Sequence, residues 1–168
     1  MPGPAFRSAG GTELRAIKSG DHEFLAEEWN SRDVRLPTNM NKPLTASDIA
    51  GFVDSDESVN FVVCADGEPV GAAWLFGIAP VHGRGELGYW TAEGHRGEGH
   101  ATTAVRLLVE YAVAEQRLRK LTARVFEGNE ASKRVLEKVG FEEEGHLRDH
   151  YYIDGEWLDA TLYAYFDE

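Results

Sequence analysis

The chain has 168 residues, 42% of them hydrophobic, which favours one globular domain with a buried core. Its 29 acidic residues outnumber 17 basic ones and give a formal net charge of -12, so the surface repels nucleic acid and anionic membranes. The longest apolar stretch, 72–81, is too short to cross a bilayer. Neither nucleic acid nor a membrane is therefore expected as a partner.

The cysteine and lysine contents give two weaker indications. The single cysteine, Cys64, lies in the apolar run "FVVC", which favours a buried structural thiol and excludes an internal disulfide or a cysteine-rich metal site. With no charged-then-apolar leader at the start, a cytoplasmic location is expected. High acidity with little lysine is expected of a protein that works in concentrated salt, and an acidic mesophilic protein is the alternative.

The first half of the chain begins with a segment rich in glycine and proline. This segment, residues 1–11, is expected to be a flexible tail, and one domain is expected over 12–168. A strand is predicted at 12–18 and a helix at 21–30, followed by a long polar connection at 31–43.

The next elements are a helix and three strands. The helix is predicted at 45–55, with Thr45 as its N-cap. Strands at 60–66 and 68–79 flank an Asp-Gly turn and form a hairpin, and another strand is predicted at 85–92.

The last third alternates strands with helices. Helices are predicted at 99–116 and at 130–139, the second ending at Gly140. Strands are predicted at 120–127, 141–154 and 156–166. The complete order indicates an α/β (α+β) domain, with a central mixed, mostly antiparallel sheet flanked by about four helices.

One stretch, "EGHRGEGHATTA" at 93–104, concentrates glycines where a strand feeds a helix. Free backbone N–H groups at the positive end of a helix dipole make a site for phosphate, and Arg96 adds charge. The dinucleotide fingerprint and the nucleotide P-loop do not fit, because the glycine order is G-x-x-G-x-G and no lysine follows. A glycine-rich turn without a ligand is the alternative.

Three segments together carry a resemblance to a known family. They are "ELGYWTAEGHRGEGHATTAVRLLVEYA", "NEASKRVLEKVGFEEEG" and "DGEWLDATLYA". With these, the chain resembles the GCN5-related N-acetyltransferase (GNAT) superfamily, and within it the RimJ/RimL-like branch of ribosomal-protein N-terminal acetyltransferases. The resemblance extends over about 12–168 and is specific from Glu86 onward.

The resemblance implies acetyl-CoA as cosubstrate. The family's pyrophosphate loop matches Arg96, Gly99 and Ala101, although pairing Gly97 with Gly99 would move its first position to Gly94. Asn129 is expected to contact the pantetheine arm, and it is also a good helix N-cap. The implied cofactor-binding residues are Leu87, Tyr89, Trp90, Arg96, Gly97, Glu98, Gly99, His100, Ala101, Asn129 and Ser132.

The implied reaction is direct attack of an amine on the thioester. It needs a base, an oxyanion donor and a proton source for the thiolate. Glu86 is the predicted base, acting through water, with a solvated strand glutamate as the alternative. Ser132 is predicted to steer the proton to sulfur, and Tyr151 or its neighbour Tyr152 would be a better acid.

The position of Tyr151 departs from the branch, whose ribosomal-protein enzymes can carry a catalytic glutamate there. The role of that glutamate would then be taken by Glu86, Asp149 or His150. No metal ligand spacing is found, and no metal is expected.

The sequence is consistent with three functions. The first is acetylation of a protein N-terminal α-amino group. The second is acetylation of a polyamine or other small amine, which an acidic rim that includes 142–144 would favour, with a solvated acidic face as the alternative for that run. The third is a non-catalytic acyl-CoA-binding regulatory module. The sequence leaves the oligomeric state open, a homodimer included, and places acceptor choice in 30–43 and 149–157.

Overall fold

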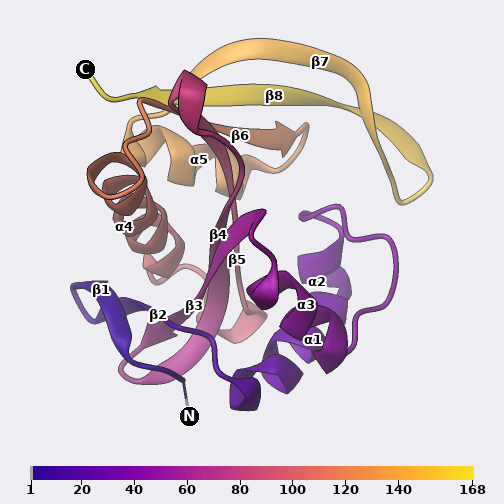
Figure 1. Cartoon of the computed structure of the whole chain (residues 1–168). Coiled ribbons are helices and arrows are strands. Elements are labelled where there is room, and N and C mark those ends of the chain that lie inside the picture. The colour runs from indigo at the N-terminus through magenta and orange to yellow at the C-terminus, as the bar shows by residue number, and fades with distance from the viewer. Residues whose placement is uncertain (1) are drawn as a thin grey trace.

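Eight strands form one sheet in the order β1-β2-β3-β4-β5-β6-β8-β7 (Figure 1). In the computed structural model, which describes residues 2–168, all neighbouring strands run antiparallel except β5 and β6, which are parallel. The strands are β1 (Ala5–Ala9), β2 (Thr12–Arg15), β3 (Ser58–Ala65), β4 (Glu68–Ala79), β5 (Arg84–Thr91), β6 (Lys120–Phe126), β7 (Glu142–Ile153) and β8 (Glu156–Phe166). The predicted mixed, mostly antiparallel sheet is confirmed.

Five α-helices accompany the sheet within residues 2–168. They are α1 (His22–Asn30), α2 (Arg32–Arg35), α3 (Ala46–Asp54), α4 (His100–Ala114) and α5 (Glu130–Val139). Four were predicted, and the predicted cap of α3 is confirmed, since the Thr45 side chain accepts a hydrogen bond from the Asp48 N–H. The fifth, α2, lies in the connection predicted to be irregular, where the buried side chain of Val34 fixes one helical turn to the core.

The predicted flexible tail at 1–11 is corrected by the structure, apart from residue 1, which lies outside the described residues. Strand β1 pairs with β2 there. The ring of Phe6 lies 5.5 Å from the rings of both Phe61 and Tyr111, measured between centroids. Aromatic contacts and a backbone ladder thus join this segment to the domain, which its glycine and proline content obscured.

Two Asp-Gly turns confirm the predicted hairpins. Asp66 and Gly67 join β3 to β4 with φ of 52° and 83°, and Asp154 and Gly155 join β7 to β8 with 53° and 85°. Positive φ at both central residues suits the right-handed twist of the flanking strands, and aspartate followed by glycine tolerates it best.

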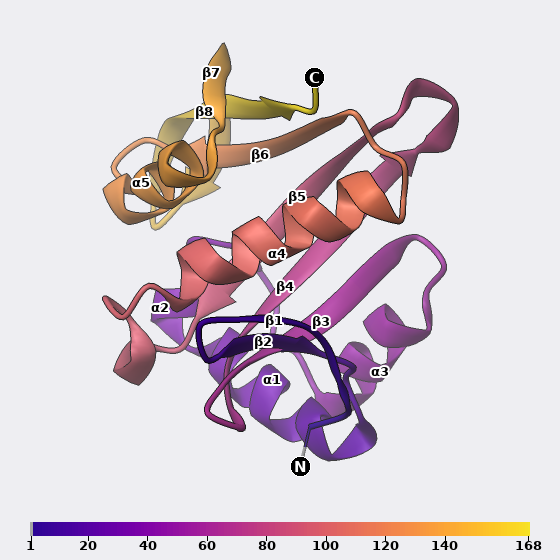
Figure 2. The same ribbon diagram turned by 90° about the vertical axis from the view of Figure 1, so that its left-hand side faces the viewer.

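Helices cover the two faces of the sheet differently. Figure 2 shows α4 crossing β4 and β5 on one face, while α1 and α3 lie on the other. Alternation along β5 follows this division: Leu87 and Tyr89 pack in the core with α4, and Trp90 packs in the second core with α1. The side chains of β5 therefore point into two separate compartments, one on the α4 face of the sheet and one on the α1–α3 face.

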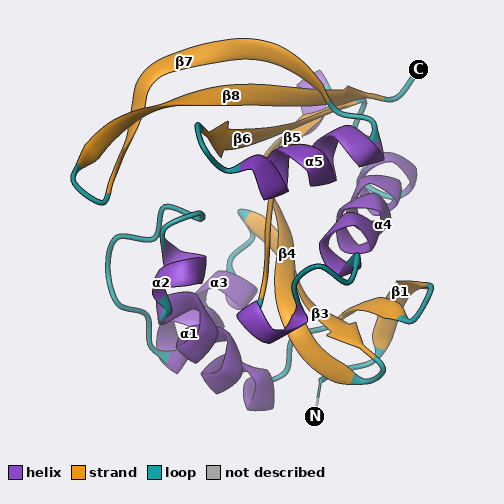
Figure 3. Cartoon of the chain, turned by 180° about the vertical axis from the view of Figure 1, so that it is seen from behind, coloured by secondary structure: helices purple, strands orange, loops and turns teal. Residues whose placement is uncertain are grey.

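The sheet opens between β5 and β6. Pairing joins only Arg84–Glu86 to Lys120–Thr122, and beyond Glu86 the two strands diverge, as Figure 2 shows. Backbone groups of β5 after Glu86 are thereby freed from the ladder on that edge. On the other side of the gap, the β7–β8 hairpin extends over α1–α3 (Figure 3), where Arg32 Nη2 lies 2.6 Å from Asp154 Oδ2.

Candidate active site

A cavity of about 780 Å³ lies where β5 and β6 diverge. One part of its lining comes from the glycine loop, the start of α4, and α5. The other part comes from α1–α3, β3, β4 and the hairpin residue Tyr151. The cavity therefore reaches both compartments that β5 separates.

The glycine loop at the start of α4 is shaped as an open anion site. Gly97 and Gly99 have φ of 78° and 83°, a conformation that side chains with a Cβ rarely adopt. Gly99 is the N-cap of α4 and provides no side-chain cap, so the first N–H groups remain for a ligand. A Cβ built on Gly99 would meet nothing within 4 Å, so the space above the loop is open.

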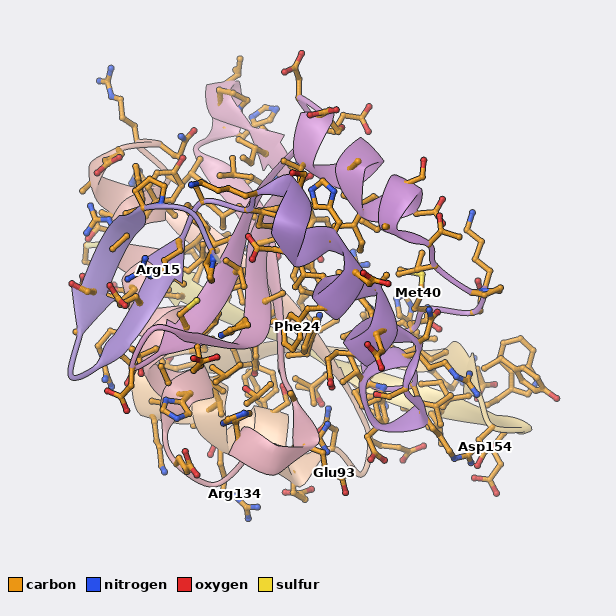
Figure 4. The ribbon with its side chains drawn as sticks, turned by 90° about the horizontal axis from the view of Figure 1, so that it is seen from below. Arg15, Phe24, Met40, Glu93, Arg134 and Asp154 are labelled. Carbon is orange, nitrogen blue, oxygen red and sulfur yellow. The ribbon has the colours of Figure 1, made fainter. Side chains whose placement is uncertain are left out.

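The cationic groups around this loop include Arg96, as expected, and two that the sequence analysis did not name. The guanidinium of Arg96 donates to the carbonyl oxygens of Thr91 (3.1 Å) and Asp33 (3.3 Å), so it braces the loop against the α1–α2 region. Arg134 and Lys138 line the cavity from α5 and were missed from sequence. Their spacing of four residues on an amphipathic helix was the available signal. Figure 4 shows Arg134 well apart from Met40, which lines the opposite compartment.

Tyr89 and Ser132 meet inside the gap. The Tyr89 hydroxyl lies 2.6 Å from Ser132 Oγ. Burial raises the pKa of Tyr89 to about 12, and the hydrogen bond to Ser132 opposes that rise. A protonated phenol thus lies beside the serine predicted to steer a proton. The sequence placed Tyr89 only among cofactor-binding residues and sought an acid at Tyr151 or Tyr152.

Asn129 is the N-cap of α5, the structural role that the sequence also allowed for it beside contact with the pantetheine arm. Its Oδ1 accepts a hydrogen bond from the Ser132 N–H at 3.3 Å, at the start of α5. The predicted helix end at Gly140 is also confirmed, with φ of 113°. Asn129 lines the cavity as well, so capping holds its amide in place at the cavity wall.

Glu86 lies on the α1–α3 side of β5, in a cluster with Arg124 and Tyr151. Arg124 Nη2 is 2.9 Å from Glu86 Oε1. Burial raises the pKa of Tyr151, while the Arg124 guanidinium opposes that rise. An irregularity in β7 between Leu147 and Tyr151, with φ of 46° at Asp149, turns the strand so that Tyr151 reaches the cavity.

Most of the other predicted site residues line the cavity, but Glu98 does not. Leu87 and Ala101 line the cavity, and Trp90 lines it from the α1 side, with its ring centroid 5.8 Å from that of Trp29. The His100 ring contacts Glu98 Oε2 at 2.9 Å and Thr12 Oγ1 at 3.1 Å. Glu98 is absent from the cavity lining, so its carboxylate is engaged away from the predicted ligand.

Three sequence alternatives are also placed by the structure. Tyr152 is 59% exposed, with its ring 5.0 Å from that of Trp157 at the hairpin tip. Asp149 and His150 are exposed, and neither is among the residues that line the cavity. Tyr151 is thus the hairpin side chain in position to meet a ligand.

A comparison with protein families matches residues 12–142 to the acetyltransferase (GNAT) domain. The chain belongs to the GNAT family. This confirms the resemblance seen in the sequence and assigns the domain to the acyltransferases that use acetyl-CoA.

Three similar proteins show the range within the GNAT family. The chain is 37% identical to the putative ribosomal N-acetyltransferase YdaF of Bacillus subtilis over 59% of its own length, and spans 54% of that protein. It is 34% identical to the spermidine N(1)-acetyltransferase of Escherichia coli, over 95% of this chain and 88% of that protein. A Vibrio cholerae spermidine N-acetyltransferase, solved with CoA and spermine, superposes with a TM-score of 0.86 at 24% identity, covering 93% and 95% of the two chains.

Two further observations concern this GNAT domain between residues 2 and 168. No three His, Cys, Asp or Glu side chains gather there as a metal-binding group. None of its helices has the length and apolar character needed to span a bilayer.

Proposed function

We propose that the protein transfers the acetyl group of acetyl-CoA to a primary amine, specifically the N-terminal α-amino group of a protein or peptide. The observation that carries this proposal is the cavity, which joins the glycine loop to the Glu86 cluster through the gap beside β5. A donor entering from one compartment and an acceptor entering from the other would meet at that gap.

The donor fits the α4–α5 side. The N–H groups at the start of α4 would bind the pyrophosphate, and Arg134 and Lys138 would add positive charge. Asn129 would contact the pantetheine arm. The backbone N–H groups of β5 in the stretch 87–90, past the end of the pairing with β6, would polarise the thioester carbonyl.

The chemistry divides between the two faces of β5. Glu86, through a water molecule, would accept the proton of the attacking ammonium, and the neutral amine would then add to the carbonyl carbon. When the carbon–sulfur bond breaks, Tyr89 would donate its proton to the thiolate, with Ser132 holding the hydroxyl at 2.6 Å. Arg124 would hold the Glu86 carboxylate in place through their 2.9 Å ion pair.

We expect Glu86→Gln to lower kcat most at acidic pH. An α-amino group has a reference pKa of about 7.7–8.0, so below that range it is charged and needs a base. At pH 6.5 the loss should reach about 100-fold, the lower end for general base catalysis, and it should shrink toward pH 9, where the amine is already neutral. The measurement is kcat against pH with a peptide acceptor.

Glu68→Gln is the matched control, because Glu68 is exposed at the start of β4 and remote from the cavity lining. It should leave the profile unchanged. A Glu86→Gln profile parallel to that of the unmodified protein at all pH values would assign the base to another group.

A polyamine is the second candidate acceptor, because the relative from Escherichia coli that is named for spermidine matches 95% of the chain. The two are separated by measuring acetyl-CoA-dependent thiol release in molar KCl. The acceptors are peptides beginning with Ala, Ser or Met, together with spermidine and free lysine. Peptide turnover supports the proposal, and turnover of spermidine alone replaces it with the small-amine function. Tight acetyl-CoA binding without turnover of any amine supports the non-catalytic module.

A further inference from the structure

The acceptor half of the cavity is walled by aromatic rings. We define the aromatic wall as Trp29, Phe52, Trp74, Phe76 and Trp90, all of which line the cavity. The ring centroid of Trp29 lies 4.9 Å from that of Trp74, 5.8 Å from that of Trp90 and 6.1 Å from that of Phe52. Trp29, Phe52, Trp74 and Trp90 therefore form one contacting group, and Phe76 lines the same cavity.

Trp74 brings this wall to the reacting strand. It pairs with Gly88 across β4 and β5, and a Cβ built on Gly88 would overlap the Trp74 indole. The indole thus lies directly on the β5 backbone, one alternate position from Glu86. An acceptor whose amine is near Glu86 would place its adjacent substituent against Trp74.

Polar contacts behind the rings hold the wall in place. The Trp29 indole N–H donates to Thr38 Oγ1 at 2.8 Å, and Thr38 Oγ1 donates to the Val34 carbonyl oxygen at 2.7 Å. The Asn30 side chain exchanges two hydrogen bonds with the backbone of Leu44, each 2.8 Å. These bonds close the 31–43 connection onto α1, so the wall exists before an acceptor binds.

Charge in this half is unsuited to a polycation. Asp33 and Glu86 are the carboxylates among the lining residues, and Glu86 is already paired with Arg124. Distal ammonium groups of a polyamine would lose water there with few carboxylates to replace it. A large apolar group would instead exchange water for ring contacts, which is favourable.

We propose that the residue whose α-amino group is acetylated carries a large apolar or aromatic side chain, and that this side chain packs against Trp74 and Trp29. The inference rests on the proposed function and names its substrate class: peptides or proteins that begin with a bulky residue such as Phe, Leu or Met, rather than Ala or Ser.

The test compares peptides that are identical except for the first residue, which is Phe, Leu, Met, Ala or Ser. We expect kcat/KM for Phe or Leu to exceed that for Ala by at least about tenfold, the lower range for filling an apolar pocket. Equal values, or a preference for Ala or Ser, would overturn the inference while leaving the peptide acetyltransferase intact. Turnover of spermidine alone would overturn both.

The variant Trp74→Ala tests whether a preference for a bulky first residue arises from the aromatic wall. It should reduce the Phe-to-Ala ratio of kcat/KM to within about threefold of unity, because the first side chain loses its main contact surface. Trp157→Ala is the control, since Trp157 is 63% exposed at the hairpin tip and outside the cavity lining, and it should preserve the ratio. Calorimetric binding of acetyl-CoA to each variant verifies folding, because the donor lies on the other face.

A binding measurement covers the case in which no peptide is turned over. The Phe and Ala peptides are titrated calorimetrically into the protein saturated with CoA. Tighter binding of the Phe peptide that Trp74→Ala abolishes supports the aromatic wall as the specificity site. Binding of neither peptide, or equal binding of both, overturns it.

Discussion

Tyr89→Phe is expected to lower kcat by about 100-fold or more, the range for loss of a general acid, with little change in KM for acetyl-CoA. The phenol is 2.6 Å from Ser132 Oγ, and the substitution removes the hydroxyl while keeping the ring. Because burial raises the pKa of Tyr89 to about 12, the hydroxyl keeps its proton across the neutral range and can supply it to the departing thiolate.

The same pKa gives a pH test with a defined sign. Since the protonated phenol is the active form and its pKa is raised from 10, kcat of the unmodified protein should not fall through pH 10 on account of Tyr89. Tyr152→Phe, on the exposed hairpin tip, is the matched control and should retain full activity. A kcat of Tyr89→Phe equal to that of the control would move the proton donor elsewhere, with Tyr151 next in position.

Gly99→Val is expected to weaken acetyl-CoA binding at least about tenfold. A Cβ at Gly99 enters open space, so no protein atom is displaced, but that space is where the pyrophosphate would approach the α4 N–H groups. The φ of 83° also disfavours a β-branched residue, which strains the loop. Isothermal calorimetry with acetyl-CoA measures the change.

Gly94→Val distinguishes this effect from a general effect of branching in the loop. Gly94 likewise has nothing within 4 Å of a built Cβ, but its φ lies outside the left-handed region and it is not in the cavity lining. The affinity of the Gly94→Val variant for acetyl-CoA should remain close to that of the unmodified protein. Equal affinities for both variants would remove the phosphate-binding role from the loop.

Local patterns predicted most of the fold because short-range chemistry determines those elements. The Thr45 cap, the two Asp-Gly turns and the Gly140 helix end each depend on the few residues around them, and all four are confirmed. Strand β1 and helix α2 were missed for the converse reason. Each is held by contacts distant in sequence: the Phe6 ring packs on Phe61 and Tyr111, and the Val34 side chain is buried in the second core.

The candidate site was only partly predictable. Glu86, Ser132 and the glycine loop were predicted because they match family motifs, whereas Tyr151 was predicted from the acidity of its phenol at a position where the chain departs from the branch; all of them line the cavity. The partnership of Tyr89 with Ser132 was missed, although strand alternation placed Tyr89 opposite Glu86. The missing information was the position of α5, which brings a serine 43 residues away to within 2.6 Å.

The sequence by itself determined the family, the glycine loop at the start of α4 and the alternation of β5, because motif spacing and strand periodicity are properties of contiguous residues. Only the tertiary structure decided which groups meet. Arg96 braces the loop, Arg134 and Lys138 line the cavity from α5, and four segments distant in sequence assemble the aromatic wall. The physical reason is the divergence of β5 from β6. This divergence opens one cavity to both faces of the sheet. The residues that line the cavity are far apart in the sequence, so the sequence alone does not show that they lie close together.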